Sequence, residues 1–262
     1  MIFLEGDLSQ IESRIVFMLT GDPELVRLAR LPSYEYDAHT ENAKYILGAK
    51  PSDPDFKLKR HVGKIVSHGA QRDMHGNMLS NQILKELGIL VPVDVCSAHI
   101  EAYHQRYPAI RNSYFFDIRR QMMREKMLVN SWGRRIDFRF DRLSDALYRK
   151  GYSFPPQSEN ADLLNRRGLL PTWKYMKATY NRPPNVQVHD SLLCSVPAVG
   201  AYDLARVIQK NLEQPIMLNG HRFTPFVEFK LGKTWAGSVE FKKLPSKEEF
   251  TEAALQLEGE QS

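Results

Sequence analysis

The sequence of 262 residues contains little cysteine, with only Cys96 and Cys194. They form no Cys-x-x-Cys pair and no spacing typical of zinc ligands, which excludes a disulfide-stapled fold and a cysteine-based metal centre. We therefore expect two free, buried thiols in a protein of a reducing compartment.

Long hydrophobic runs are also missing. No apolar stretch approaches the ~18 residues of a membrane helix, and the first residues, Met1 to Asp7, lack the basic start and long apolar core of a signal peptide. Internal repeats and low-complexity tracts are absent as well. These absences predict a protein without membrane association, located in the cytoplasm, or in the host cytoplasm if the sequence is viral.

The composition is otherwise ordinary. Hydrophobic residues make up 42% of the chain and charged residues 26%, as in a typical globular protein. The length is sufficient for one large domain or two intertwined subdomains with a sizeable core. The net charge of +5 and the pI near 9.1 are compatible with a polyanionic partner, although many soluble proteins are equally basic.

The first stretch places an acid between a strand and a helix. Ile2 to Glu5 alternate as a short strand, and Asp7 follows it, where a carboxylate can face a cleft. We expect Ser9 to cap the next helix, with Glu12 completing a capping box. A capping role for the acids is the alternative to a catalytic one.

The segment Lys57–Arg72 contains five basic residues and no acid. Arg60, Lys64 and His68 recur every four positions, so one helix face carries all three. A row of cations is usually a solvated face, but such faces normally interleave acids. Gly63 and Gly69 are costly inside a helix, and we expect them to let a flat group approach the backbone.

A second acid stands at a predicted hairpin tip. Two β-prone runs, 186–188 and 192–196, flank His189, Asp190 and Ser191 at a tight turn. Asp190 could then lie beside Asp7 on a neighbouring strand. An ordinary hairpin with a polar tip is the alternative interpretation.

These segments, in this order, resemble the family A DNA polymerases, the group of bacterial polymerase I, over residues 2–236. Asp-x-Ser-Gln-Ile-Glu-x-Arg from Asp7 resembles motif A, Arg60 to Gly69 resembles the O helix, and Val188-His-Asp190 resembles motif C. The resemblance implies an α+β fold, with an antiparallel palm sheet packed with helices, an inserted helical fingers subdomain and no thumb. The implied parts are 1–36 palm, 37–125 fingers, 126–237 palm and 238–262 a C-terminal tail helix.

The same resemblance implies template-directed DNA synthesis, in which a deoxynucleotide is transferred to a primer 3′-OH with two Mg²⁺ ions, or Mn²⁺ in their place. Its partners would be primer-template DNA and dNTPs. Asp7 and Asp190 would hold the ions with the carbonyl of Leu8, and Lys64 would protonate the leaving pyrophosphate. Glu12 would reject a 2′-hydroxyl. The implied nucleotide-binding residues are Gln10, Glu12, His39, Arg60, Lys64, His68 and Arg72.

Further segments match the family's DNA contacts. Gly133, Arg134 and Arg135 resemble a turn that binds phosphates, with exposed arginines on a hairpin as the alternative. Arg149 and Gln157 match minor-groove positions, although a polar loop leading into a helix remains plausible. By the same resemblance His189 would contact the primer end.

The chain departs from the family pattern at several positions. Arg72 stands where the family has tyrosine, Asp73 where it has glycine, Ser191 where it has glutamate and Ser153 where it has asparagine. Arg72 and Ser191 support one alternative, a non-catalytic nucleic-acid-binding palm relic. An enzyme like the single-subunit RNA polymerases, built on the same palm, is the other alternative. Because the family's thumb and any exonuclease domain precede motif A, we expect either one half of a split polymerase or a shortened polymerase chain. A second polypeptide would then supply the thumb, with or without an exonuclease.

Overall fold

The computed structural model of the protein describes residues 1–237 and 239–259. Residues 238 and 260–262 of the predicted tail lie outside the described residues. The chain divides into two compact units. The sheet unit comprises Met1–Ile11, Glu159–Ile216 and the chain from Arg222 on, and the helical unit comprises Glu12–Ser158 with Met217–His221. The subdomain limits inferred from the sequence stay a prediction.

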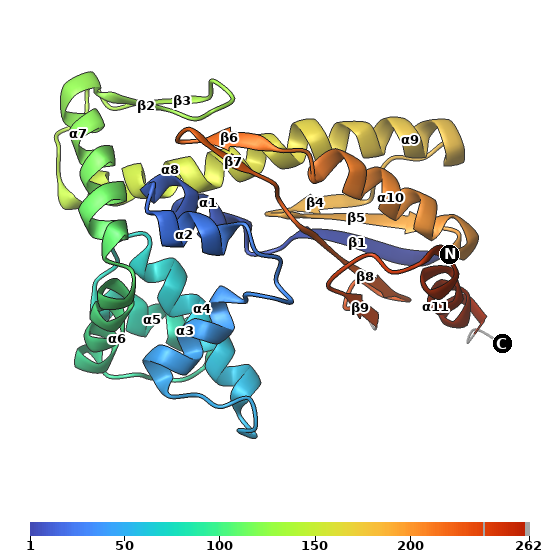
Figure 1. Ribbon diagram of the computed structural model, residues 1–262, viewed down its shortest axis with the longest axis horizontal. Coiled ribbons are helices and arrows are strands. Elements are labelled where there is room, and N and C mark those ends of the chain that lie inside the picture. The colour runs from blue at the N-terminus through green and yellow to red at the C-terminus, as the bar shows by residue number, and fades with distance from the viewer. Residues whose placement is uncertain (238, 260–262) are drawn as a thin grey trace. The chain divides into compact units, whose positions relative to one another are not determined.

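The sheet unit is built on a five-stranded sheet in the order β4-β5-β1-β8-β9, with every neighbouring pair antiparallel. Strand β1 is central, so its residues pair on both sides (Figure 1). This mixed helical and antiparallel-sheet architecture confirms the predicted α+β class. The elements are β1 (Ile2–Leu8), η2 (Leu164–Leu169), α9 (Leu170–Tyr180), β4 (Val186–Val188), β5 (Ser191–Val196), η3 (Ala198–Gly200), α10 (Ala201–Leu212), β8 (Val227–Gly232), β9 (Val239–Phe241) and α11 (Lys247–Gly259).

Alternation along β1 gives the sheet one apolar face. Leu4 and Leu8 are fully buried, and α10 and α11 pack on this strand. A Cβ at Gly6 would lie 3.0 Å from the Ile208 side chain of α10, so any side chain here would crowd this close packing. The intervening residues Glu5 and Asp7 therefore point to the opposite face.

The helical unit contains most of the helices. Its core includes the fully buried side chains of Phe17, Tyr103, Tyr114, Phe138 and Tyr152. Its elements are α2 (Pro23–Ala29), α3 (Ala38–Leu47), α4 (Phe56–Ala70), α5 (Gly76–Leu87), α6 (Val93–Arg106), η1 (Ile110–Phe115), α7 (Phe116–Glu125), β2 (Met127–Val129) and β3 (Arg135–Asp137). Four elements contribute to both units: α1 (Ile11–Thr20), α8 (Asp145–Leu163), β6 (Ile216–Leu218) and β7 (His221–Phe223).

Buried polar bonds fix the helices of this unit to one another. The Tyr107 hydroxyl donates to Asn42 Oδ1 at 2.9 Å, and Asn42 Nδ2 donates to Ser67 Oγ at 2.8 Å, which links α6, α3 and α4. Arg14 of α1 is 3% exposed and donates to the carbonyls of Ala29 and Leu31. The arginine of the motif A string therefore secures the chain that follows α2.

Both cysteines are free and buried, as predicted. No helix in the described part of the chain is long and apolar enough to cross a membrane. The cytoplasmic location stays a prediction.

Candidate active site

An acidic cluster lies on the open face of the sheet. In the register of the central strand, Asp7 is opposite Ser191 on β5 and Glu228 on β8. The amide of Leu8 donates to the carbonyl of Asp190 at 2.9 Å. The hairpin tip carrying Asp190 is therefore bonded to the residue after Asp7, as the sequence predicted for two acids on neighbouring strands.

This environment raises the pKa of Asp7 from 3.8 to about 7. Burial is the largest cause, followed by the negative charges of Asp190, Glu228 and Glu5, while Lys230 opposes the change. Near neutral pH a proton on Asp7 competes with any cation for the carboxylate. A cation bound here would relieve the repulsion among the acids.

Glu228 is a member of this cluster that sequence reasoning missed. It follows the first residue of β8, and its Oε1 accepts a hydrogen bond from Ser9 Oγ at 2.7 Å. The available signal was alternation, because Val227, Phe229 and Leu231 are buried and leave Glu228 on the other face. α1 begins at Ile11, two residues after Ser9, and the capping role of Ser9 stays a prediction.

The donor atoms of the cluster suit a hard divalent cation. Asp7 and Asp190 offer carboxylate oxygens and Leu8 a backbone carbonyl, which are the ligand types that Mg²⁺ prefers. Among the described residues no group of three or more His, Cys, Asp or Glu side chains is arranged to hold a metal ion. An ion here would thus need further oxygens from water or from phosphate.

The two turns beside the acids have a left-handed backbone without glycine. Gln10, just after β1, has φ 52°, and His189, just before Asp190, has φ 51°. His189 occupies the two-residue turn between β4 and β5, where glycine is the usual choice for positive φ. It is exposed, so its ring is free of the core.

In the helical unit, α4 carries the predicted cationic face. Lys64 is exposed. Arg60 is partly engaged, because its Nη2 pairs with Asp37 Oδ2 at 2.6 Å and its Nε donates to Thr40 Oγ1 at 3.1 Å. Asp37 also caps α3 by accepting from the amide of Thr40. Arg60 is thereby held beside the start of α3 while 38% of its side chain remains exposed.

Two histidines lie side by side near these cations. The ring centroids of His39 and His68 are 5.5 Å apart. Burial, then Arg72 and Lys64, lower the pKa of His68 to about 3. Burial followed by the charges of His68, Lys64 and Arg60 also lowers the pKa of His39 well below its ordinary value. Both rings are therefore neutral at physiological pH, and buried His39 Nδ1 has no hydrogen-bond partner among the described residues.

The glycines of α4 serve helix packing. A Cβ at Gly63 would lie 3.0 Å from the Ala43 amide nitrogen and 3.1 Å from the His39 carbonyl oxygen. At Gly69 it would meet Leu79 and Met74 side chains, each at 3.3 Å. The expectation that these glycines admit a flat ligand was wrong, because protein atoms already occupy the space.

Arg72 lies beyond the end of α4 at Ala70, so it does not continue the helical row. Its Nη2 donates to Glu12 Oε2 at 2.6 Å. Both residues were predicted to bind nucleotide, and here they form an ion pair with each other.

Four of the five predicted DNA-binding residues lie in the helical unit, and the fifth, His189, lies in the sheet unit. Arg134 and Arg135 are exposed at the turn and start of β3, after Gly133 with φ 84°. Arg149 and Gln157 lie on α8, a helix where the alternative interpretation had a loop. Arg149 Nη1 is 3.2 Å from His75 Nε2, and Gln157 is exposed.

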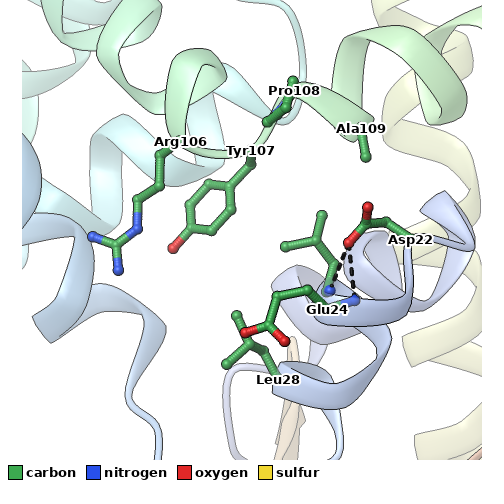
Figure 2. A pocket seen from close by; sticks show the side chains of 8 residues that line it. Asp22, Glu24, Leu28, Arg106, Tyr107, Pro108 and Ala109 are labelled. Carbon is green, nitrogen blue, oxygen red and sulfur yellow. Dashed lines mark hydrogen bonds between the residues drawn. The ribbon is translucent and has the colours of Figure 1, made fainter.

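A separate pocket of about 320 Å³ lies in the helical unit, between the start of α2 and the end of α6. Asp22, Glu24, Arg106 and Tyr107 supply its polar wall, and Asp22 also caps α2 (Figure 2). None of the predicted site residues lines it.

Residues 1–237 match the family model described as DNA polymerase family A. The chain belongs to DNA polymerase family A. Within the family, the chain is 28% identical to the thermostable DNA polymerase I of Thermus caldophilus, over 87% of this chain and 26% of that protein. It is 30% identical to the corresponding enzyme of Thermus filiformis, over 89% of this chain and 27% of that protein.

The chain spans about a quarter of the length of these family A relatives. The fold also matches a solved structure, the POL domain of Pol1 from M. smegmatis in complex with DNA primer-template and dNTP. The TM-score is 0.68 at 22% identity, covering 90% of this chain and 40% of that one.

Proposed function

We propose that the chain is the catalytic palm and fingers part of a template-directed DNA polymerase, which transfers a deoxynucleotide to a primer 3′-OH. The observation that carries the proposal is the place of Asp190 at the tip of the β4–β5 hairpin, beside β1. Ser191 is opposite Asp7, the amide of Leu8 donates to the carbonyl of Asp190, and the pKa of Asp7 is raised by burial and by neighbouring acids. Family membership supports it.

In this reaction the 3′-oxygen forms a bond to the α-phosphorus while the bond from that phosphorus to the pyrophosphate breaks. Two divalent ions, when bound, would stabilise the charge on the attacking and leaving oxygens. Asp7 and Asp190, with the carbonyl of Leu8, would hold Mg²⁺ or Mn²⁺, because all three offer oxygen ligands. The half-buried cluster would thus keep negative charge where cations are needed.

The cations of α4 would act on the triphosphate. Arg60 and Lys64 would neutralise its charge, and Lys64 would give a proton to the leaving pyrophosphate. His68, a neutral ring, would lie against the sugar or base, with His39 and Gln10 assigned to the nucleotide as well. Glu12 would exclude a 2′-hydroxyl and so select dNTPs.

Primer-template DNA would be bound without regard to its sequence. Arg134 and Arg135 would contact phosphates, Arg149 and Gln157 the minor groove, and His189 the primer end. The solved relative holds primer-template and dNTP, which supports both as partners here. A second polypeptide with a thumb stays a prediction, tested by comparing processive extension with and without such a partner.

The test is incorporation of one nucleotide on a primed template with Mg²⁺. Asp7→Ala and Asp190→Ala should each lower the rate by roughly 10²- to 10³-fold or more, because charge stabilisation at the reacting phosphate is lost. Binding of primer-template should change by less than about twofold, since phosphate contacts dominate DNA affinity. Asp203→Ala, which removes an acid of α10 that pairs with Lys247, is the matched control.

Two results would favour the alternatives. A wild-type chain that binds primed DNA but incorporates nothing would indicate the non-catalytic relic. Faster incorporation of NTPs than of dNTPs would indicate an RNA polymerase.

A further inference from the structure

Arg72 and Glu12 form a sheltered ion pair within the helical unit. The distance from Arg72 Nη2 to Glu12 Oε2 is 2.6 Å, and the side chains are only 26% and 21% exposed. Charge-assisted hydrogen bonds of this length are stronger than neutral ones. Partial burial also weakens screening by salt, so this pair differs from an ordinary surface pair.

Neighbouring residues fix the backbone on both sides of the pair. Ser13, next to Glu12, donates its hydroxyl to Gln71 Oε1 at 3.2 Å. Gln71, next to Arg72, donates from Nε2 to the buried Tyr103 hydroxyl at 2.7 Å. The start of α1 and the end of α4 are therefore held in register by a neutral contact that does not depend on the ion pair.

The same carboxylate oxygen also faces His68. His68 Nδ1 lies 3.7 Å from Glu12 Oε2, too far for a hydrogen bond. The neutral ring cannot balance the charge of Glu12, which leaves that task to Arg72. The cationic face of α4 thus ends at the His68 ring. The Glu12 carboxylate lies beside this ring and is bound by the Arg72 guanidinium.

A fixed carboxylate and a mobile carboxylate interact differently with the 2′-hydroxyl of a ribonucleotide. A mobile carboxylate can turn aside or accept a hydrogen bond from a 2′-OH, as acidic residues do in ribose-binding sites. A carboxylate whose oxygen is already bound to a guanidinium occupies a fixed volume and has less capacity to accept. Holding Glu12 therefore converts it from a ribose acceptor into an obstacle.

We propose that Arg72 is a positioning residue for sugar selection, which holds Glu12 so that dNTPs are preferred over NTPs. The inference rests on the proposed function, which places the nucleotide sugar beside Glu12. Arg72 acts through Glu12 and need not touch the nucleotide.

The experiment measures kcat/KM for one-step incorporation of dATP and of ATP opposite the same template base. Arg72→Gln should lower the dATP-to-ATP ratio by about tenfold or more, the effect expected for losing a charged hydrogen bond. Arg72→Lys, which keeps the charge, should restore part of the ratio. In a Glu12→Gln background Arg72→Gln should add nothing, because the residue through which it acts has already changed.

The control is Arg111→Gln, which breaks the 2.7 Å pair with Glu101 in the same unit and should leave the ratio unchanged. If Arg72→Gln unfolds the chain in a thermal melt, Arg72→Lys and Glu12→Gln still test the proposal. An equal rise in KM for dATP and ATP with an unchanged ratio, or independent effects in the double variant, would overturn it. A wild-type chain without any incorporation would instead end the proposed function, and this inference with it.

Discussion

At the scale of single residues, Asp7 combines a structural cost with the chemical role proposed for it. Its pKa of about 7 means that the folded protein holds a proton there more tightly than the unfolded chain, whose value is near 3.8. Stability contributed by this site therefore falls as pH rises from about 4 to about 7, and the full cost remains above that range. Below about pH 4 both states are protonated and the cost vanishes.

Asp7→Asn should accordingly stabilise the metal-free protein at pH 8 and have little effect at pH 4. The gain is at most about 4 kcal/mol, since each tenfold change in proton affinity is worth about 1.4 kcal/mol. Urea unfolding at both pH values measures it. Mg²⁺ at pH 8 should stabilise the wild type but not the variant, because the ion needs the charged carboxylate.

Asp203→Asn, at an exposed position of α10, is the control and should show neither effect. Equal stability of Asp7→Asn and wild type at pH 8 without metal would show that the charged Asp7 carboxylate does not destabilise the folded protein.

At the scale of elements, the packing of α3 on α4 positions the histidines and Arg60. The contact at Gly63 is to backbone atoms of Ala43 and His39, which cannot move without shifting α3. Gly63→Ala would gain up to about 1 kcal/mol of helix propensity and lose about 1 to 3 kcal/mol to overpacking. If the full gain is realised, we expect a net loss of up to about 2 kcal/mol, measured by thermal unfolding. Gly259→Ala has open space around its Cβ and should be neutral or slightly stabilising.

Elements with a local pattern could be predicted from the sequence. Alternation and turn residues indicated β1 and the hairpin that carries Asp190, and the four-residue spacing of cations indicated α4. The roles of residues whose partners are distant in the sequence could not be predicted. Glu228 joins Asp7 only through sheet register, Gly63 meets a helix that begins 25 residues earlier at Ala38, and Arg72 is 60 positions from Glu12.

The roles proposed for the site residues came mainly from the family resemblance. The acids, the cations and their order along the chain were recognisable, and the family is confirmed. The ion pair of Arg72 with Glu12 could not be recognised from the sequence. Arg72 departs from the family pattern, and the pattern therefore gives no information about the partner of this arginine.

At the scale of the whole molecule, the net charge of +5 favours a polyanionic partner but is too small to define a surface. The exposed arginines at the β2–β3 turn are the local feature that would bind a polyanionic partner. If they neutralise phosphates, each arginine should release counterions on binding, so the affinity for primer-template DNA should fall steeply with salt.

The double variant Arg134→Gln, Arg135→Gln should bind primer-template DNA more weakly, to a similar degree on unrelated sequences. The slope of log affinity against log salt should become shallower by up to about 2, because each phosphate that an arginine neutralises adds close to 0.9 to the slope. Fluorescence anisotropy at several salt concentrations measures both quantities. Lys85→Gln, an exposed cation of α5 outside the predicted DNA-binding residues, should leave the slope unchanged. An unchanged slope in the double variant would mean that these arginines are solvated hairpin residues, and the DNA-binding surface would have to be sought on α8, where Arg149 and Gln157 lie.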